Sequence, residues 1–171
     1  MGTRNLTAVV MNDKYVVAQY GQWDGYIEGQ GYVVSDFLMA YDLDKFKEKL
    51  LKVEFTEDYG AAKFNRDDGS TILKKIAEGK SNILINELDF AADSLFCEYA
   101  YVLNMDTNEL EVFTGFNKCE LNKGERFYSM TEKVEAHSDY QPIKFLFKLP
   151  FSECTREKLI ATYNELTSED E

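Results

Sequence analysis

The chain has 171 residues, with 19 Lys and Arg against 31 Asp and Glu, so its formal net charge at pH 7 is −12. The hydrophobic share of 44% and the aromatic share of 14% are enough for one sizeable core, which excludes disorder, collagen and coiled coil for the chain as a whole. No apolar run approaches the roughly 18 residues that a membrane helix needs, so we expect no membrane association.

The negative charge bears on the kind of partner. Because the chain repels phosphate, we expect no direct binding to nucleic acid, which relies on Lys and Arg to release counterions. Two interpretations of the acidity remain open. The protein is either an ordinary acidic domain that its charge keeps monomeric, or a surface that imitates nucleic-acid phosphate and docks on a basic protein.

The three cysteines, Cys97, Cys119 and Cys154, lie far apart and include no C-x-x-C pair. The N-terminal residues do not resemble a signal peptide, so we expect reduced thiols and a cytoplasmic protein. Cys97 stands in an alternating strand and is predicted as a buried, inert thiol. His137, the only histidine, lies in a polar stretch typical of an exposed loop. One histidine and scattered cysteines predict no metal site, and we expect no cofactor.

The first predicted element is a strand at residues 4–11, followed by a turn at 12–14 and a returning strand at 15–20, which together indicate a β-hairpin. Four glycines then fall within eleven residues, at Gly21, Gly25, Gly29 and Gly31. Such spacing suits a backbone that needs positive φ or close approach of another segment. The pattern is not G-x-G-x-x-G, so it does not indicate a nucleotide site.

Apolar residues recur at intervals of three and four over residues 32–41, which predicts a helix. Asp42 or Asp44 can cap a second short helix. A turn at residues 67–70 precedes a third predicted helix at residues 71–78.

The later part of the chain is predicted to form strands and one helix. Residues 95–104 alternate in polarity, residues 106–108 form a turn and residues 110–116 return, which predicts a second hairpin. Residues 143–149 are predicted as a further strand. Thr155 can then cap a final helix, whose apolar stripe is Leu159, Ile160, Tyr163 and Leu166.

These elements predict an α+β fold, in which an antiparallel sheet built from two hairpins plus a further strand has helices packed on it. Strands that come in hairpins, and do not alternate singly with helices, argue against a doubly wound parallel sheet. We expect a single domain over residues 1–166 and an acidic tail at residues 167–171.

The densest candidate site is the glycine-rich loop at residues 19–31, where a strand gives way to a loop that the scaffold fixes on one side. Trp and Tyr offer flat faces for stacking, Gln offers both donors and acceptors, and a carboxylate among aromatic rings can act as an acid or base. The predicted binding residues are Arg4, Gln19, Tyr20, Gln22, Trp23, Asp24, Tyr26 and Gln30.

A structural interpretation of the same residues stays open. Trp23 can fill the core beneath the loop, while Asp24 and the Gln side chains hydrogen-bond the glycine-rich backbone. Arg4, on the neighbouring strand, can pair with Asp24 and so make it a member of an ion pair and not a base.

Five blocks carry a resemblance to a known family: residues 2–7 (GTRNLT), 17–26 (VAQYGQWDGY), 29–31 (GQG), 97–102 and 111–117. They resemble a family of small uncharacterised proteins of bacteria, phages and fungi, whose members often have Pro where this chain has Ile27. The resemblance implies a shared fold and draws attention to the loop, but it implies no reaction.

A weaker likeness is to N-terminal-nucleophile hydrolases, whose first hairpin also starts at the mature N-terminus. Their mechanism needs a Cys, Ser or Thr whose own α-amine serves as the base. Removal of Met1 exposes Gly2, which has no nucleophile, and Thr3 would need a further cut.

The sequence therefore supports two hypotheses. The favoured one is a non-enzymatic interaction protein that docks on a basic nucleic-acid-binding protein, as a phage or mobile-element inhibitor of the anti-defence or anti-CRISPR type would. The alternative is a small-ligand or hydrolytic site on the loop at residues 19–31, with Asp24 as base or anchor and Trp23 and Tyr26 as walls. Homo-oligomerisation through an exposed sheet edge is compatible with either.

Overall fold

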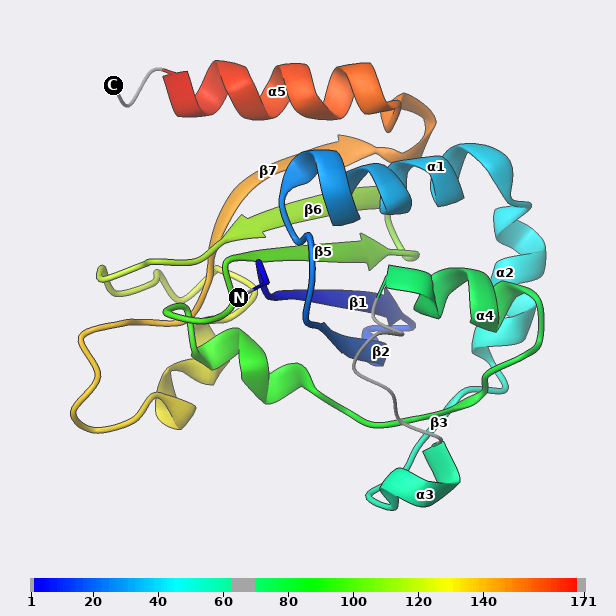
Figure 1. Ribbon diagram of the computed structural model, residues 1–171, viewed down its shortest axis with the longest axis horizontal. Helices are drawn as coiled ribbons and strands as arrows, with labels where there is room; N and C mark the ends of the chain where they lie inside the picture. Colours follow the sequence, from blue (N-terminus) through cyan, green and yellow to red (C-terminus); the bar gives the residue numbers. More distant parts are fainter. Residues whose placement is uncertain (1, 63–69, 169–171) are drawn as a thin grey trace.

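The computed structural model describes residues 2–62 and 70–168, and a five-stranded sheet lies at its centre (Figure 1). The strands run in the order β2-β1-β5-β6-β7. Their bounds are β1 Asn5–Met11, β2 Lys14–Gly21, β5 Tyr99–Asn104, β6 Glu109–Thr114 and β7 Lys144–Pro150. Two short strands, β3 Glu54–Phe55 and β4 Ile83–Leu84, form a separate parallel pair.

Helices and single helical turns connect these strands. The α-helices are α1 Tyr32–Ala40, α2 Leu43–Leu50, α3 Tyr59–Ala62, α4 Ile72–Ala77 and α5 Arg156–Ser168. The segment η1 Ile27–Gly31 is a π-helical turn that leads directly into α1. Three further turns are 3₁₀-helical: η3 Leu88–Ala92, η4 Tyr128–Lys133 and η5 Phe151–Glu153. The fold is therefore mixed α+β.

The sheet is antiparallel except where β1 lies beside β5, with which it pairs in parallel. This parallel pair corrects the predicted antiparallel sheet. The chain leaves β2 beside the start of β1 and, after the segment that carries α1 to α4, re-enters the sheet at the same end. Strand β5 therefore runs beside β1 in the same direction, as parallel strands joined by a long crossover do. The local pattern of each strand does not encode where that segment returns.

Each face of the sheet is covered, because successive strand residues point to opposite sides. On one face Val9, Tyr101 and Val112 pack with residues of α1, α2, α4 and α5, including Phe37 and Leu159. In Figure 1, α1 lies across the front of the sheet and α5 along its β7 edge. The core thus has one layer of helices.

The opposite face is covered by irregular chain. Leu6, Ala100 and Phe113 of the sheet pack there against Phe127 and Ile143, which belong to the long connection between β6 and β7. The turns η3 and η4 complete this layer. Few regular elements are predicted for these segments, because their apolar residues follow neither a helical nor a strand period.

Several local predictions can be compared directly with the structure. The N-cap of α2 is Asp42, whose Oδ1 accepts the N–H groups of Asp44 and Lys45 at 3.0 and 3.2 Å. Thr155 Oγ1 accepts the N–H of Lys158 at 3.2 Å, which is the cap predicted for α5. That helix runs on to Ser168 and so takes up the first residues of the predicted tail.

The predicted turn at residues 67–70 lies almost wholly outside the described residues. Within residues 2–62 and 70–168, no helix has both the length and the apolar character that a membrane crossing demands.

The two turns at the far end of the central strands are joined by one carboxylate. Asp106 accepts the backbone N–H of Asn12 at 2.8 Å and that of Asp13 at 2.9 Å. Both donors lie in the β1–β2 turn with positive φ, near 56° and 60°. The hydrogen bond from Asp13, followed by that from Asn12, lowers the pKa of Asp106 below its ordinary value of 3.8.

This geometry predicts a pH-dependent stability difference for Asp106→Asn. A lowered folded-state pKa stabilises the fold above the unfolded-state pKa, and that contribution disappears as the pH falls through the folded-state value. The variant should therefore unfold at lower urea concentration than the wild type at neutral pH, and the gap should narrow as the pH falls below the unfolded-state pKa and close below the folded-state pKa. Asp139→Asn, in an exposed loop, serves as the control. A gap that stays constant over this pH range would contradict the assignment.

Candidate functional site

All five strands of the central sheet end or begin together at one of its ends. Asn5, at the start of β1, lies opposite Gly21 at the end of β2 and beside Tyr99 at the start of β5. Tyr99 lies opposite Thr114, the last residue of β6. The segments that enter or leave the sheet here are therefore neighbours, and they include the glycine-rich loop.

Hydrogen bonds fix this loop against β1 and β5. The N–H of Gly25 donates to the Thr3 carbonyl oxygen at 2.9 Å, and the Tyr101 hydroxyl donates to the Gly25 carbonyl oxygen at 2.6 Å. The buried Asn5 amide donates to the carbonyl oxygens of Thr3 and Trp23 at 3.4 and 3.3 Å. Neither Asn5 nor Tyr101 is among the predicted site residues, although a polar side chain in a buried strand indicates a partner nearby.

Four predicted site residues make contacts within the loop and its strand. Gln30 is buried, and its Nε2 donates to Thr7 Oγ1 at 2.9 Å. Gln19 is also buried and donates to the Tyr20 carbonyl oxygen at 3.2 Å. The Tyr20 hydroxyl donates to Gln22 Oε1. These contacts are those expected of side chains that secure the loop.

The glycine at position 29 is required by close packing. An ideal Cβ there would lie 2.1 Å from the Asp24 carbonyl oxygen, a distance that no side chain can occupy. The same oxygen accepts the N–H of Gln30 at 2.7 Å, and Asp24 itself has a φ of 52°. Close approach, more than positive φ, therefore explains this glycine.

The remaining predicted residues of the loop face solvent. Trp23 is 52% exposed, so it does not fill the core beneath the loop as the structural interpretation proposed. Asp24 and Tyr26 are also exposed, and the Tyr26 hydroxyl donates to Asp24 Oδ1 at 3.2 Å. The charge of Asp24 raises the pKa of Tyr26 above its ordinary value.

A second group of exposed apolar side chains lies at the same end of the sheet. Leu95 and Phe96 precede β5, and Phe116, 57% exposed, follows β6 with a φ of 54°. The guanidinium of Arg4 lies 5.2 Å from the centre of the Phe96 ring. Among the described residues, Arg4 makes no ion pair with Asp24, which leaves their suggested pairing without support.

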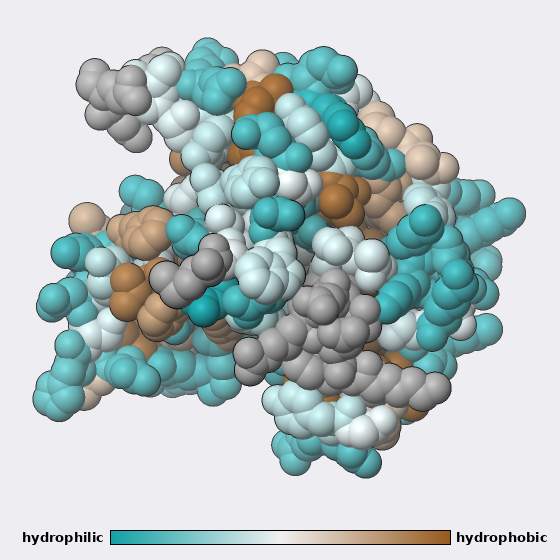
Figure 2. Space-filling view, in the orientation of Figure 1, coloured by the Kyte–Doolittle hydropathy of each residue, from teal (hydrophilic) through white to brown (hydrophobic). Residues whose placement is uncertain are grey.

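We call this surface the aromatic end; it comprises Arg4, Trp23, Asp24, Tyr26, Leu95, Phe96 and Phe116. Figure 2 shows brown and tan atoms gathered at the left of the view, over the segment before β5 and the end of β6. Leu95, Phe96 and Phe116 lie inside the strands predicted from the sequence. Their exposure depends on where those strands begin and end, and the alternation of polar and apolar residues along a strand does not determine its ends.

Carboxylates accompany these apolar side chains. The charge of Glu28 adds to the burial that raises the pKa of the Tyr101 hydroxyl. Burial also raises the pKa of the Cys97 thiol, and the charges of Asp93 and Glu98 add to that rise. The segments that carry the aromatic end therefore also carry the carboxylates of Glu28, Asp93 and Glu98, beside the cation Arg4.

Other residues singled out in the sequence lie elsewhere or are inert. Cys97 and Cys154 are buried, and burial raises the pKa of Cys154 to about 12, so neither is a nucleophile at neutral pH. His137 lies in an exposed loop. Within the part of the chain that the structure describes, no three His, Cys, Asp or Glu side chains converge in a way that could hold a metal ion.

Comparisons of this chain with protein-family models, with curated proteins and with solved structures gave no match.

The close approach at Gly29 predicts a stability cost for Gly29→Ala. The added Cβ must displace the Asp24 carbonyl, so the variant should lose about 1–3 kcal/mol of unfolding free energy. Gly124→Ala is the matched control, because an ideal Cβ at that position meets no atom within 4 Å. Urea denaturation of the two variants measures the difference. Equal stability would show that the loop relaxes freely and that its backbone is not held as described.

Proposed function

We propose that this protein is a non-enzymatic interaction protein that docks its aromatic end on a basic surface of another protein. The observation that carries the proposal is the set of exposed Trp, Tyr, Phe and Leu side chains on the segments that enter or leave one end of the sheet. Trp and Tyr are the side chains that most often dominate binding energy at protein interfaces. Exposed apolar clusters of this kind are common at such surfaces.

Charge specifies the chemistry of the partner. The chain carries a net charge of −12, and the carboxylates Asp24, Glu28 and Glu98 belong to the segments around the aromatic end. A partner rich in Lys and Arg would be steered toward this field, and its cations could stack on the exposed rings. The basic surfaces of nucleic-acid-binding proteins have this composition, so we propose such a protein as the target. An inhibitor of the anti-defence or anti-CRISPR type would act in this way.

The alternative, a small-ligand or hydrolytic site on the same loop, receives less support from the geometry. The amides of Gln19 and Gln30 are buried and donate to atoms of the protein itself. Asp24 is exposed and accepts a hydrogen bond from Tyr26. These groups would have to give up their partners before they could bind a substrate.

The test compares capture of basic proteins from a bacterial lysate by immobilised wild type and by a Trp23→Ala/Phe116→Ala variant. Both side chains are more than half exposed, so the fold should survive, as circular dichroism would verify. We expect the wild type to retain a basic nucleic-acid-binding protein at low salt, and the variant to retain at least about tenfold less, as loss of interface anchors predicts. Raising the ionic strength should weaken the wild-type complex.

Leu51→Ala is the matched control, because Leu51 is 70% exposed and lies at the end of α2, away from the aromatic end. It should bind as the wild type does. The proposal fails if no basic protein is retained at low salt, or if the Leu51 variant loses the partner as completely as the double variant.

A further inference from the structure

A separate hollow lies on the sheet face that irregular chain covers. Its volume is about 510 Å³, within the range of small-molecule sites in proteins. Residues of β6, of β7 and of the segment 124–126 line it. None of the residues of the aromatic end lines it, so a ligand in this cavity is independent of the proposed docking function.

A β-bulge between β6 and β7 shapes this cavity. Glu111 lies opposite Lys148, but Phe113 lies opposite Phe145, so β7 has one residue more than β6 over this interval. The extra residue turns Phe145 to the same face as Phe113. The two rings meet edge to face, with centroids 5.8 Å apart and planes at 73°. Bulges often redirect a side chain in this way at binding sites.

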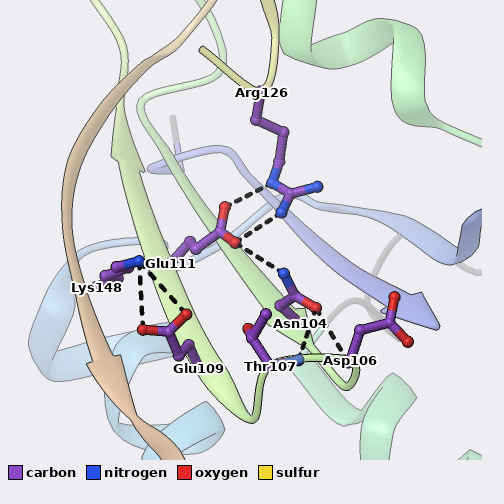
Figure 3. A network of polar contacts seen from close by, with 7 residues as sticks. All are labelled: Asn104, Asp106, Thr107, Glu109, Glu111, Arg126 and Lys148. Atoms are coloured by element: carbon purple, nitrogen blue, oxygen red, sulfur yellow. Dashed lines mark hydrogen bonds and ion pairs between the residues drawn. The ribbon is translucent and has the colours of Figure 1, made fainter. Parts of the chain in front are cut away.

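A nearly buried ion pair stands beside these rings. The Nε and Nη2 atoms of Arg126 donate to the two carboxylate oxygens of Glu111 at 2.5 and 2.6 Å (Figure 3). The side chains are 22% and 11% exposed. Asn104 Nδ2 also donates to Glu111, at 3.4 Å. Burial of two charges is costly even when they pair, and residues of similar size without charge often stabilise a fold better.

Two carboxylates and two cations line the cavity, and Lys148 is the cation with the longer ion-pair contact. Arg126 occupies both oxygens of Glu111, and Glu125 Oε2 accepts the N–H of Asn122 at 2.7 Å. Lys148 is half exposed, has three N–H donors and meets Glu109 only at 3.4 Å. Such a surface ion pair contributes little free energy, so another anion can replace it. Arg126 carries five donors, of which Glu111 takes two, and it also has a side-chain hydrogen bond with Tyr15.

We propose that this cavity binds an aromatic monocarboxylate. The ring of the ligand would lie against Phe113 and Phe145, and its carboxylate would accept hydrogen bonds from Lys148. The weakly paired ammonium group of Lys148 selects an acceptor, and the two phenyl rings select a flat apolar body. The net charge of −12 disfavours more highly charged anions such as nucleotides.

Phenylacetate is the probe, and the amide signals of the isotope-labelled protein in two-dimensional NMR are the readout. We expect saturable shifts at Phe113, Phe145 and Gly124 on titration to millimolar concentration. Benzylamine, which has the same ring but a cationic group, should leave these signals in place. 2-Phenylethanol, of similar size and without charge, should bind at least about tenfold more weakly, because a charge-assisted hydrogen bond is lost.

Two variants locate the ligand. Lys148→Met should weaken phenylacetate binding by about tenfold or more. Lys144→Met is its matched control, since Lys144 is exposed on the same strand and, as the neighbour of Phe145, points to the other face. Gly124→Leu should abolish binding without disturbing the fold, because its side chain enters open space at the cavity.

The proposal is overturned by any of three results. The first is that phenylacetate produces no saturable shifts in the wild type. The second is that benzylamine binds as well as phenylacetate. The third is that the Lys148→Met and Gly124→Leu variants bind phenylacetate as the wild type does. Because both variants alter solvent-facing positions, an NMR spectrum of each without ligand establishes that it is folded before the titration is interpreted.

Discussion

The burial of β1 along its whole length is the constraint on which the rest of the structure depends. All seven of its residues are buried, because the strand lies between β2 and β5 and under a layer of chain on each face. Two of these residues, Asn5 and Thr7, are polar, and a buried polar group costs free energy unless it is hydrogen-bonded. Asn5 donates to the loop backbone, and Thr7 accepts from Gln30. The central strand therefore fixes the conformation of the loop that follows its partner.

This arrangement explains why Trp23 and Tyr26 are exposed. Between residues 21 and 31 the inner side of the loop packs closely at two glycines. Gly25 hydrogen-bonds the Thr3 carbonyl oxygen, and Gly29 lies against the Asp24 carbonyl, so neither position has room for a side chain. The aromatic residues of the loop are left on its outer side. Residues 93–98 and 115–117 are tied to each other in a similar way, since the N–H of Phe116 donates to the Ser94 carbonyl oxygen at 2.6 Å. Two hydrogen-bonded segments thus present their apolar side chains at one end of the sheet.

The sequence indicates the parts of this structure that local periods and turn chemistry determine. The alternation in β5 and β6, the spacing of three and four in α1, and Asp42 and Thr155 as caps are all local properties. The parallel pairing of β1 and β5 is not local, because it depends on where a long helical segment re-enters the sheet. The site follows the same division. Trp23 and Asp24 stand out in the sequence. The exposure of Phe96 and Phe116 depends on where the neighbouring strands begin and end, which the sequence pattern does not determine. The ion pair of Glu111 with Arg126 joins two segments that are not neighbours in the sequence.

Two features of the molecule run against stability, and they lie in different places. A chain selected only to fold would gain from polar side chains in place of the exposed Phe96 and Phe116, which add nothing to the core. It would also gain from apolar residues in place of Glu111 and Arg126 on a sheet face that is otherwise formed by Leu6, Ala100 and Phe113. Natural proteins tolerate such costs mainly where binding needs them. The first departure leaves apolar side chains exposed at one end of the sheet, and the second lines a concave cavity of small-molecule size. An exposed apolar surface suits a macromolecule and a cavity suits a small molecule, so the two features argue for two kinds of ligand on one scaffold.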